Sequence, residues 1–169
     1  PQVGAPAAAT RRMMARRARR GRPSVRGLTV VELMLAVGVL AVLLGLALPA
    51  FNSYRNKAKS THAAKEIALM AAAIEAHWQE RRAYPDTLAD VGLADRRDPW
   101  GRAYVYYNVE ARGRGRARKD RALNPINSDF DLYSPGADGE THSQVSHRRS
   151  ADDVLRANNG RFVGLGADF

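Results

Sequence analysis

Cysteine is absent from all 169 residues of this chain. Its absence excludes a disulfide framework, a thiolate metal site and a cysteine nucleophile. The sequence also lacks the G-x-S-x-G, H-E-x-x-H and P-loop motifs, and its carboxylates show no spacing typical of general acid–base catalysis. These absences predict that the protein is not an enzyme.

Acidic residues are absent from the first 27 positions, which hold eight arginines and carry a charge of +8. The rest of the chain has 19 basic and 17 acidic residues, so only +2 of the formal net charge of +10 lies outside this segment. Because the positive charge is concentrated at one end, the high pI does not indicate a nucleic-acid-binding protein. We interpret residues 1–27 as a basic leader that is not part of the fold.

Polar residues are absent from positions 33–48, and the longer run from Leu28 to Phe51 contains only Thr29 and Glu32 as polar side chains. As a helix, this run would rise about 36 Å, which is enough to cross the hydrocarbon core of a bilayer. The preceding arginines predict that the N-terminal end stays in the cytoplasm and that the rest of the chain crosses the membrane. Two alternatives stay open: an ordinary secretory signal peptide cut after the apolar run, and an uncleaved anchor.

Apolar residues continue at helical spacing after the apolar run, which predicts one continuous helix from residue 28 to about Arg82, shortly before Pro85. Its first half, residues 28–51, would lie in the membrane, and its second half, residues 52–82, would pack one face against a soluble domain. The apolar stripe of the second half consists of Ile67, Met70, Ala71, Ile74 and Trp78.

The remaining residues, 83–169, predict a small domain with β-strands. We expect a helical turn near 88–93, strands at 103–109 and 129–134, a glycine-punctuated basic loop at 111–123, a sharp break at 135–139 and a short helix at 151–157. Together with the long helix, these elements predict an α+β fold.

The start of the apolar run resembles the class III signal of type IV pilins and type II secretion pseudopilins. Gly27 is followed by Leu-Thr-Val-Val-Glu-Leu-Met, with Glu32 at the fifth position, and Pro49 stands where the family often has a helix-kinking proline. In that family a membrane peptidase cleaves after the glycine and methylates the new N-terminus, here Leu28, where most members have phenylalanine. The resemblance implies that Glu32 neutralises the α-amino group of Leu28 in a neighbouring subunit during fibre assembly.

Three further segments resemble the major pseudopilin family of type II secretion (general secretion pathway protein G). They are Tyr-Pro at 84–85, Asp-Pro-Trp-Gly at 98–101 and Asp-Leu-Tyr-Ser-Pro-Gly-Ala-Asp-Gly at 131–139. With the N-terminal signal, the resemblance covers most of residues 26–154. It implies a pilin-like fold in which a long N-terminal helix packs against a small antiparallel β-sheet with a C-terminal loop.

The same resemblance implies a structural role. The processed subunit would be held in the inner membrane by a single span, with its C-terminal domain in the periplasm, and would polymerise into a short fibre that drives export of folded proteins. Its partners would be copies of itself, minor pseudopilins, the prepilin peptidase and the inner-membrane assembly platform. A type IV pilus subunit for adhesion, motility or DNA uptake stays an alternative, as does a signal-anchored periplasmic binding domain that never polymerises.

A calcium site in the C-terminal loop is also implied by the resemblance. Its candidate ligands are the carboxylates of Asp138, Asp152 and Asp153 and the carbonyl oxygen of Pro135. Calcium takes six to eight oxygen ligands, and the glycines of this segment allow carbonyls to turn inward. The alternative is that these acids are solvated turn residues.

Residues 141–149 depart from the family pattern, which often has Gly-Gly-Glu-Gly here. They contain Arg148 and Arg149, whose charge would oppose a bound cation, and His142 and His147, which with an aspartate could form a zinc site instead.

The loop that follows the first predicted strand is rich in arginine. It lacks interleaved aromatic residues for base stacking, and its glycines favour a solvated surface loop, so nucleic acid is not an expected partner. Its basic residues are Arg112, Arg114, Arg116, Arg118, Lys119 and Arg121.

Overall fold

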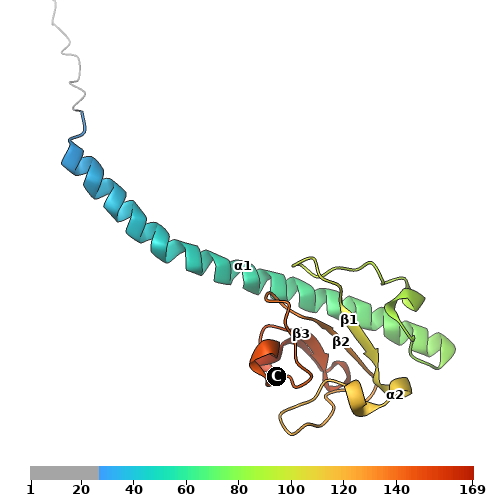
Figure 1. The fold of residues 1–169 in the computed structure, drawn as a ribbon. Coiled ribbons are helices and arrows are strands. Elements are labelled where there is room, and N and C mark those ends of the chain that lie inside the picture. Colours follow the sequence, from blue (N-terminus) through green and yellow to red (C-terminus); the bar gives the residue numbers. More distant parts are fainter. Residues whose placement is uncertain (1–26) are drawn as a thin grey trace, which may run out of the picture. The chain divides into compact units, whose positions relative to one another are not determined.

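The computed structural model describes residues 27–169, apart from the side chains of Pro49 and Ala50. The predicted leader therefore lies outside the described residues, except for Gly27. The described chain divides into two units, residues 27–42 and 43–169. Figure 1 shows the long helix α1, which runs through parts of both, and the small sheet of the second unit.

Helix α1 spans Val30–Arg81, which confirms the predicted continuous helix. Thr29 caps its start, because Thr29 Oγ1 accepts a hydrogen bond from the N–H of Glu32 at 3.2 Å. The helix stops at Arg82, whose backbone is left-handed with a φ of 55°. Pro85 follows three residues later and disfavours any return to helical conformation in the residue before it.

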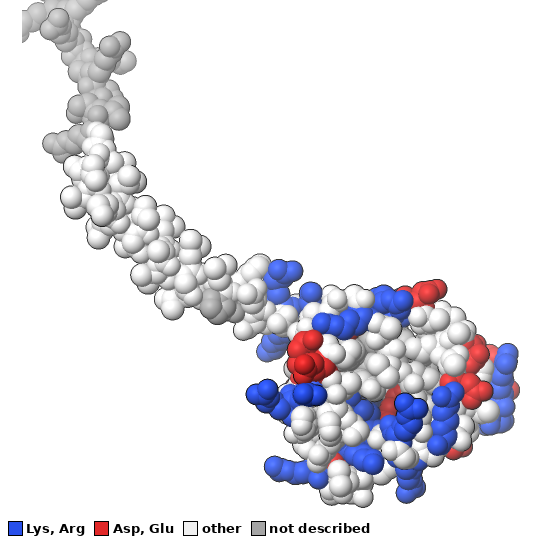
Figure 2. Space-filling model, in the orientation of Figure 1, with Lys and Arg blue, Asp and Glu red and all other residues white. Residues whose placement is uncertain are grey.

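The first part of α1 exposes its apolar side chains. Residues 27–48 are all exposed, and residues 33–48 carry no charge. Within residues 27–169, α1 is the one helix that is long and apolar enough to cross a membrane, judged by length and composition. Figure 2 shows the contrast with the second unit, whose surface carries both basic and acidic side chains.

The second part of α1 forms one wall of the hydrophobic core. Ile67, Met70, Ala71 and Ile74 are buried, which confirms the predicted apolar stripe. Trp78, the last member of the stripe, is half-buried. Its indole ring stacks on the ring of Tyr84 at a centroid separation of 6.1 Å.

Four strands form one antiparallel sheet in the order β1-β2-β3-β4. They are β1 Val105–Asn108, β2 Phe130–Ser134, β3 Val154–Ala157 and β4 Phe162–Leu165. In Figure 1 the sheet lies against the second part of α1. Phe130, Leu132 and Val154 are fully buried in the same cluster as the α1 stripe. The predicted pilin-like α+β arrangement is therefore confirmed.

Short helical segments complete the fold. They are α2 Val109–Arg112 and 3-10 turns at Leu88–Val91, Arg114–Arg116, Arg148–Ser150, Asn158–Gly160 and Gly166–Asp168. The turn at Leu88–Val91 confirms the predicted helical turn, and β1 and β2 confirm the two predicted strands within three residues at each end.

The predicted short helix at 151–157 is wrong, because residues 154–157 form strand β3. Strand β3 pairs with β2 on one side and with β4 on the other, and the burial of Val154 and Leu155 in the sheet outweighs helix propensity.

Strand β4, in the glycine-rich end, was not predicted. The turn before it places Asn158, Asn159 and Gly160 at positive φ, a conformation that asparagine and glycine tolerate.

Two buried tyrosines predict a loss of stability at alkaline pH. Burial raises the pKa of Tyr104 and Tyr106 above the ordinary value of 10.0. Their hydroxyls donate to Glu66 Oε2 and to the Pro85 carbonyl oxygen. Because the folded-state pKa lies above the unfolded value, the stabilisation is complete below pH 10 and is lost as pH rises beyond it. Each tyrosine should contribute a slope of about 1.4 kcal/mol per pH unit to the free energy of unfolding.

Chemical denaturation of the full chain in detergent between pH 9 and pH 11 would measure this slope. Tyr104→Phe should reduce it, whereas Tyr54→Phe, at an exposed tyrosine of α1, should leave it unchanged. Equal slopes in the two variants would contradict the prediction.

Candidate functional site

The start of α1 places the predicted processing residues before the helix and the predicted assembly residue in its first turn. Gly27 and Leu28 are exposed and precede the first helical residue. A Cβ added to Gly27 would meet no atom within 4 Å among the described residues. Folding of the described chain therefore does not require glycine at this position.

Glu32 is exposed in the first turn of α1. The partial positive charge of a helix N-terminus favours a carboxylate there, and Thr29-x-x-Glu32 has the spacing of a capping box. Only the backbone N–H of Glu32 takes part in the observed cap. Pro49 lies within α1, and its side chain is outside the described part of the structure.

Two segments singled out in the sequence, 98–101 and 134–139, meet in space. Asp98 is 4% exposed, and its Oδ1 accepts the N–H groups of Trp100 and Arg102 at 3.0 and 2.8 Å. Its Oδ2 accepts the hydroxyl of Ser134 at 2.5 Å. The Ser134 hydroxyl oxygen in turn accepts the N–H of Gly136 at 3.2 Å. A buried carboxylate therefore joins the two segments.

We call residues 134–139 the C-terminal turn. Asp152 binds one side of it, since its Oδ2 accepts the N–H groups of Ala137 and Asp138 at 2.7 and 3.0 Å. Arg102 binds the other side, since its guanidinium donates to the carbonyl oxygens of Gly136 and Ala137 at 2.5 and 3.2 Å. The backbone of the turn is thus held by one anion and one cation from the chain itself.

The three predicted metal-binding aspartates are not brought to one point. Asp153 is fully buried and pairs with Arg118 Nη2 at 2.7 Å, while Thr141 donates to the same carboxylate oxygen. Asp138 is exposed, and its Oδ1 accepts the N–H of Glu140 in its own turn. Among residues 27–169, no group of three or more histidine, cysteine or acidic residues is arranged to hold a metal ion. Calcium binding stays a prediction, which this geometry does not favour.

The two histidines considered for zinc lie face to face. The rings of His142 and His147 are 4.2 Å apart at an angle of 25°. Their Nδ1 atoms accept the backbone N–H groups of Gln144 and Arg149, both at 3.2 Å. A metal ion binds a histidine nitrogen in the plane of the ring, so a stacked pair with both Nδ1 atoms occupied is a poor chelate.

The basic loop is divided by the fold. Arg112, Arg114, Arg116 and Arg121 are exposed, as predicted for a solvated surface. Arg118 instead is 3% exposed, and its guanidinium lies 4.2 Å from the ring centroid of Tyr133. Burial raises the pKa of Asp153, and the charge of Arg118 opposes that rise.

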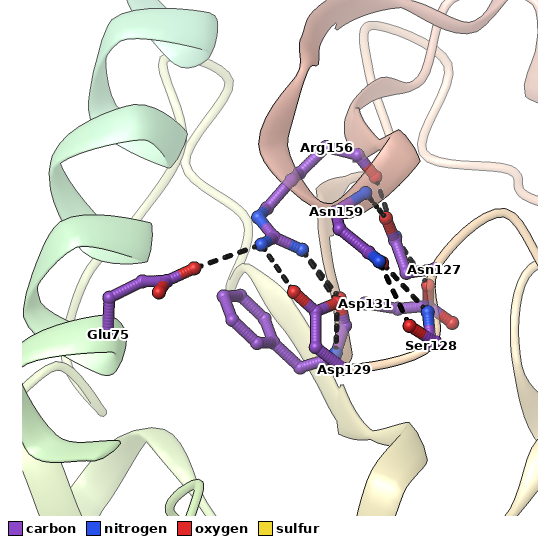
Figure 3. A network of polar contacts seen from close by, with 8 residues as sticks. Glu75, Asn127, Ser128, Asp129, Asp131, Arg156 and Asn159 are labelled. Atoms are coloured by element: carbon purple, nitrogen blue, oxygen red, sulfur yellow. Dashed lines mark hydrogen bonds and ion pairs between the residues drawn. The ribbon is translucent and has the colours of Figure 1, made fainter. Parts of the chain in front are cut away.

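A second buried arginine links α1 to the sheet (Figure 3). Arg156, in β3, is 2% exposed and binds both carboxylate oxygens of Asp129 at 2.9 and 2.6 Å. It also donates to Glu75 of α1 at 3.2 Å, and its guanidinium lies 4.0 Å from the ring centroid of Phe130. We call Glu75, Asp129 and Arg156 the arginine bridge.

Amide side chains extend the arginine bridge into the neighbouring loops (Figure 3). Asn127 donates to Asp131 Oδ1 and to the Arg156 carbonyl oxygen at 2.9 and 3.0 Å. Asn159 Oδ1 accepts the N–H of Ser128. Sequence reasoning missed Arg102, Arg118 and Arg156. Only Arg156 had a usable signal: in a strand it would share a face with Val154, two residues away, and an arginine on a buried face needs a partner.

No family model matches the chain, and no solved structure matches it. The type II secretion system core protein G of Pseudomonas aeruginosa is 28% identical over 135 residues, which span 68% of this chain and 84% of that protein. The type IV major pilin protein PilA of Myxococcus xanthus is 29% identical over 97 residues, spanning 57% of this chain and 43% of PilA. Fimbrial protein Q of Moraxella bovis is 32% identical over 74 residues, spanning 40% of this chain and 47% of that protein.

The structure of this chain itself has the expected pilin-like arrangement, a long apolar helix packed on a four-stranded antiparallel sheet. Pilins and pseudopilins are structural proteins. Fold, N-terminal signal and sequence similarity lead to one conclusion: the chain has the fold and the sequence features of the type IV pilin superfamily, whose members are structural proteins and not enzymes.

Proposed function

We propose that this chain is a subunit of a type II secretion pseudopilus. In this proposal the prepilin peptidase cuts after Gly27 and methylates Leu28, and the mature subunit waits in the inner membrane with residues 83–169 in the periplasm. An assembly platform then adds it to a short fibre of like subunits, with minor pseudopilins as further partners, and the growing fibre drives export of folded proteins. Support comes from the similarity to the Pseudomonas secretion protein, which spans 84% of that protein.

The observation that carries the proposal is the exposed Glu32 at the start of an uncharged helical surface. No basic residue follows Glu32 in the sequence until Arg55. A carboxylate within hydrocarbon costs on the order of 3 kcal/mol at a central position, so such a group normally has a partner or a function. Cleavage after Gly27 creates an α-amino group at Leu28, one helical turn from Glu32 in sequence. In a fibre of parallel helices, the amine of one subunit can pair with Glu32 of the next.

The test must separate the effect of the Glu32 charge on assembly from any effect of Glu32 on the start of the helix, where Thr29 and Glu32 have the spacing of a capping box. Glu32→Gln keeps a side chain that can cap the helix, but it removes the charge. We expect this variant to be processed and to fail to form fibres, and we expect Thr29→Ala, which removes the cap hydroxyl, to form them. The yield of fibres from cells whose outer membrane has been removed and mass analysis of the mature N-terminus, with methyl-Leu28 expected, are the measurements. Normal fibre growth by Glu32→Gln would refute the proposed charge pairing.

A type IV pilus subunit is the second candidate, because the matches to PilA and to fimbrial protein Q are pilin matches of similar identity. Deletion of the gene distinguishes the two functions. Loss of enzymes from the culture medium with intact surface pili supports the secretion role, whereas loss of pili with normal secretion supports the pilus role. A mature protein that starts elsewhere than Leu28 would exclude both.

A further inference from the structure

The C-terminal turn contains two successive carbonyl groups that converge on one cation. Arg102 Nη1 donates to the Gly136 oxygen and Arg102 Nη2 to the Ala137 oxygen. Two parallel N–H groups of a planar guanidinium match a pair of neighbouring oxygens, which a point charge would not require. We infer that Arg102 takes the place of a calcium ion at this turn, so that the C-terminal loop is held without metal.

One oxygen of each candidate aspartate is already bound within the chain, whereas Asp153 Oδ1 is buried without a hydrogen-bond partner. Calcium takes six to eight oxygen ligands. Asp152 Oδ2 faces two backbone N–H donors of the turn, Asp153 pairs with Arg118, and Asp138 Oδ1 accepts a backbone N–H. A divalent cation placed at the two carbonyls would also lie against the positive charge of Arg102. The two carbonyl oxygens of the C-terminal turn, with Arg102 bound to both, therefore do not fit a calcium ion.

The glycines of the turn fit the charged side chains around it. Gly139 has a φ of 74°, and a Cβ added there would lie 2.5 Å from Arg102 Nε. Gly136 has a φ of 67°, and a Cβ there would collide with the backbone and carboxylate of Asp152. Each glycine thus leaves room for one of the two ionic groups that hold the turn, besides supplying the left-handed backbone.

The position of Arg102 is itself fixed from the segment 98–101. Its N–H donates to Asp98 Oδ1 and its carbonyl oxygen accepts the N–H of Asp98, both at 2.8 Å. Asp98 also binds Ser134 at the start of the C-terminal turn. The buried carboxylate therefore positions both the donor and the acceptors of the arginine contact, independently of whether the chain assembles into a fibre.

Thermal unfolding of the full chain in detergent, followed by circular dichroism in chelator and in millimolar calcium chloride, tests the inference. The wild type should melt at the same temperature in both, and calorimetric titration with calcium chloride should give no saturable heat. Arg102→Ala should melt several degrees lower in chelator, and Arg102→Lys should fall between the two. Arg96→Ala, at an exposed arginine of the same segment, should melt like the wild type.

Two results would overturn the inference. One is a fall in the wild-type melting temperature on adding chelator, which shows that a metal ion holds the loop. The other is equal melting of Arg102→Ala and Arg96→Ala in chelator, which shows that the guanidinium contacts contribute nothing. The wild-type measurements stay decisive even if Arg102→Ala fails to fold.

Discussion

Arg156→Met is expected to lower the free energy of unfolding by about 3–5 kcal/mol, which corresponds to a fall of about 10 °C in melting temperature. Methionine preserves much of the side-chain volume but removes the charge. Asp129, whose side chain is 12% exposed, then loses both hydrogen bonds of its ion pair. The helix also loses its contact from Glu75 to the sheet. Chemical denaturation of the full chain in detergent measures the effect.

Arg161→Met is the matched control, because Arg161 is exposed and lies just before β4. This control should stay within about 0.5 kcal/mol of the wild type. If Arg156→Met were no less stable than Arg161→Met, the arginine bridge would be a by-product of packing and not a source of stability.

Arg118→Met should produce a defect that depends on pH. Without Arg118, Asp153 is a fully buried carboxylate that has lost its cation, so the expected loss is about 3–5 kcal/mol near pH 8. Burial already raises the pKa of Asp153 above 3.8, and removal of Arg118 raises it further. A folded-state pKa above the unfolded value gives stability that is full below pH 3.8 and is lost as pH rises through the folded-state value. The variant should therefore recover stability on acidification from pH 8 to pH 5.

A double variant, Arg118→Met with Asp153→Leu, supplies the control for this pH dependence. Since no buried charge remains at this position, the double variant should regain most of the stability at pH 8 and should lose the additional pH slope. A flat pH profile of Arg118→Met, or a double variant less stable than the single one at pH 8, would contradict the assignment of the defect to the unpaired carboxylate.

The long helix and its packing face could be predicted because they depend on local signals. The apolar run, the spacing of Ile67, Met70 and Ile74, and Pro85 after the end all act within a few turns of helix. The strand at 130–134 was predictable for the same reason, since alternation and the Pro-Gly break after it are local.

The helix predicted at residues 151–157 was wrong because groups far away in the sequence determine the conformation of this segment. Ala-Asp-Asp-Val-Leu-Arg-Ala has acceptable helix propensity, but Asp152 holds the C-terminal turn, and Asp153 meets Arg118, 35 residues earlier. The pairing of Arg156 with Glu75 crosses 81 residues. Sequence patterns show that a residue is charged, but not which opposite charge the fold will bring to it.

The candidate site residues also fall into those that a local sequence pattern identifies and those that depend on long-range contacts. Gly27, Leu28 and Glu32, the predicted processing and assembly residues, lie within six positions of one another, so a local pattern is enough to name them. The predicted metal residues depend on how two separate segments meet, and the sequence could not show that Arg118 would pair with Asp153 or that Arg102 would bind the carbonyls of the C-terminal turn.

The contact between Glu75 and Arg156 has a geometric consequence for any repeating assembly of this chain. Apolar packing is non-directional, so an apolar helix face alone does not fix the position of the helix along a sheet. An ionic contact at 3.2 Å does not, because a slip of one turn would move Glu75 by about 5.4 Å and break it. The ion pair with Arg156 therefore fixes the register of α1 along the sheet, and this register would be the same in every copy of the subunit.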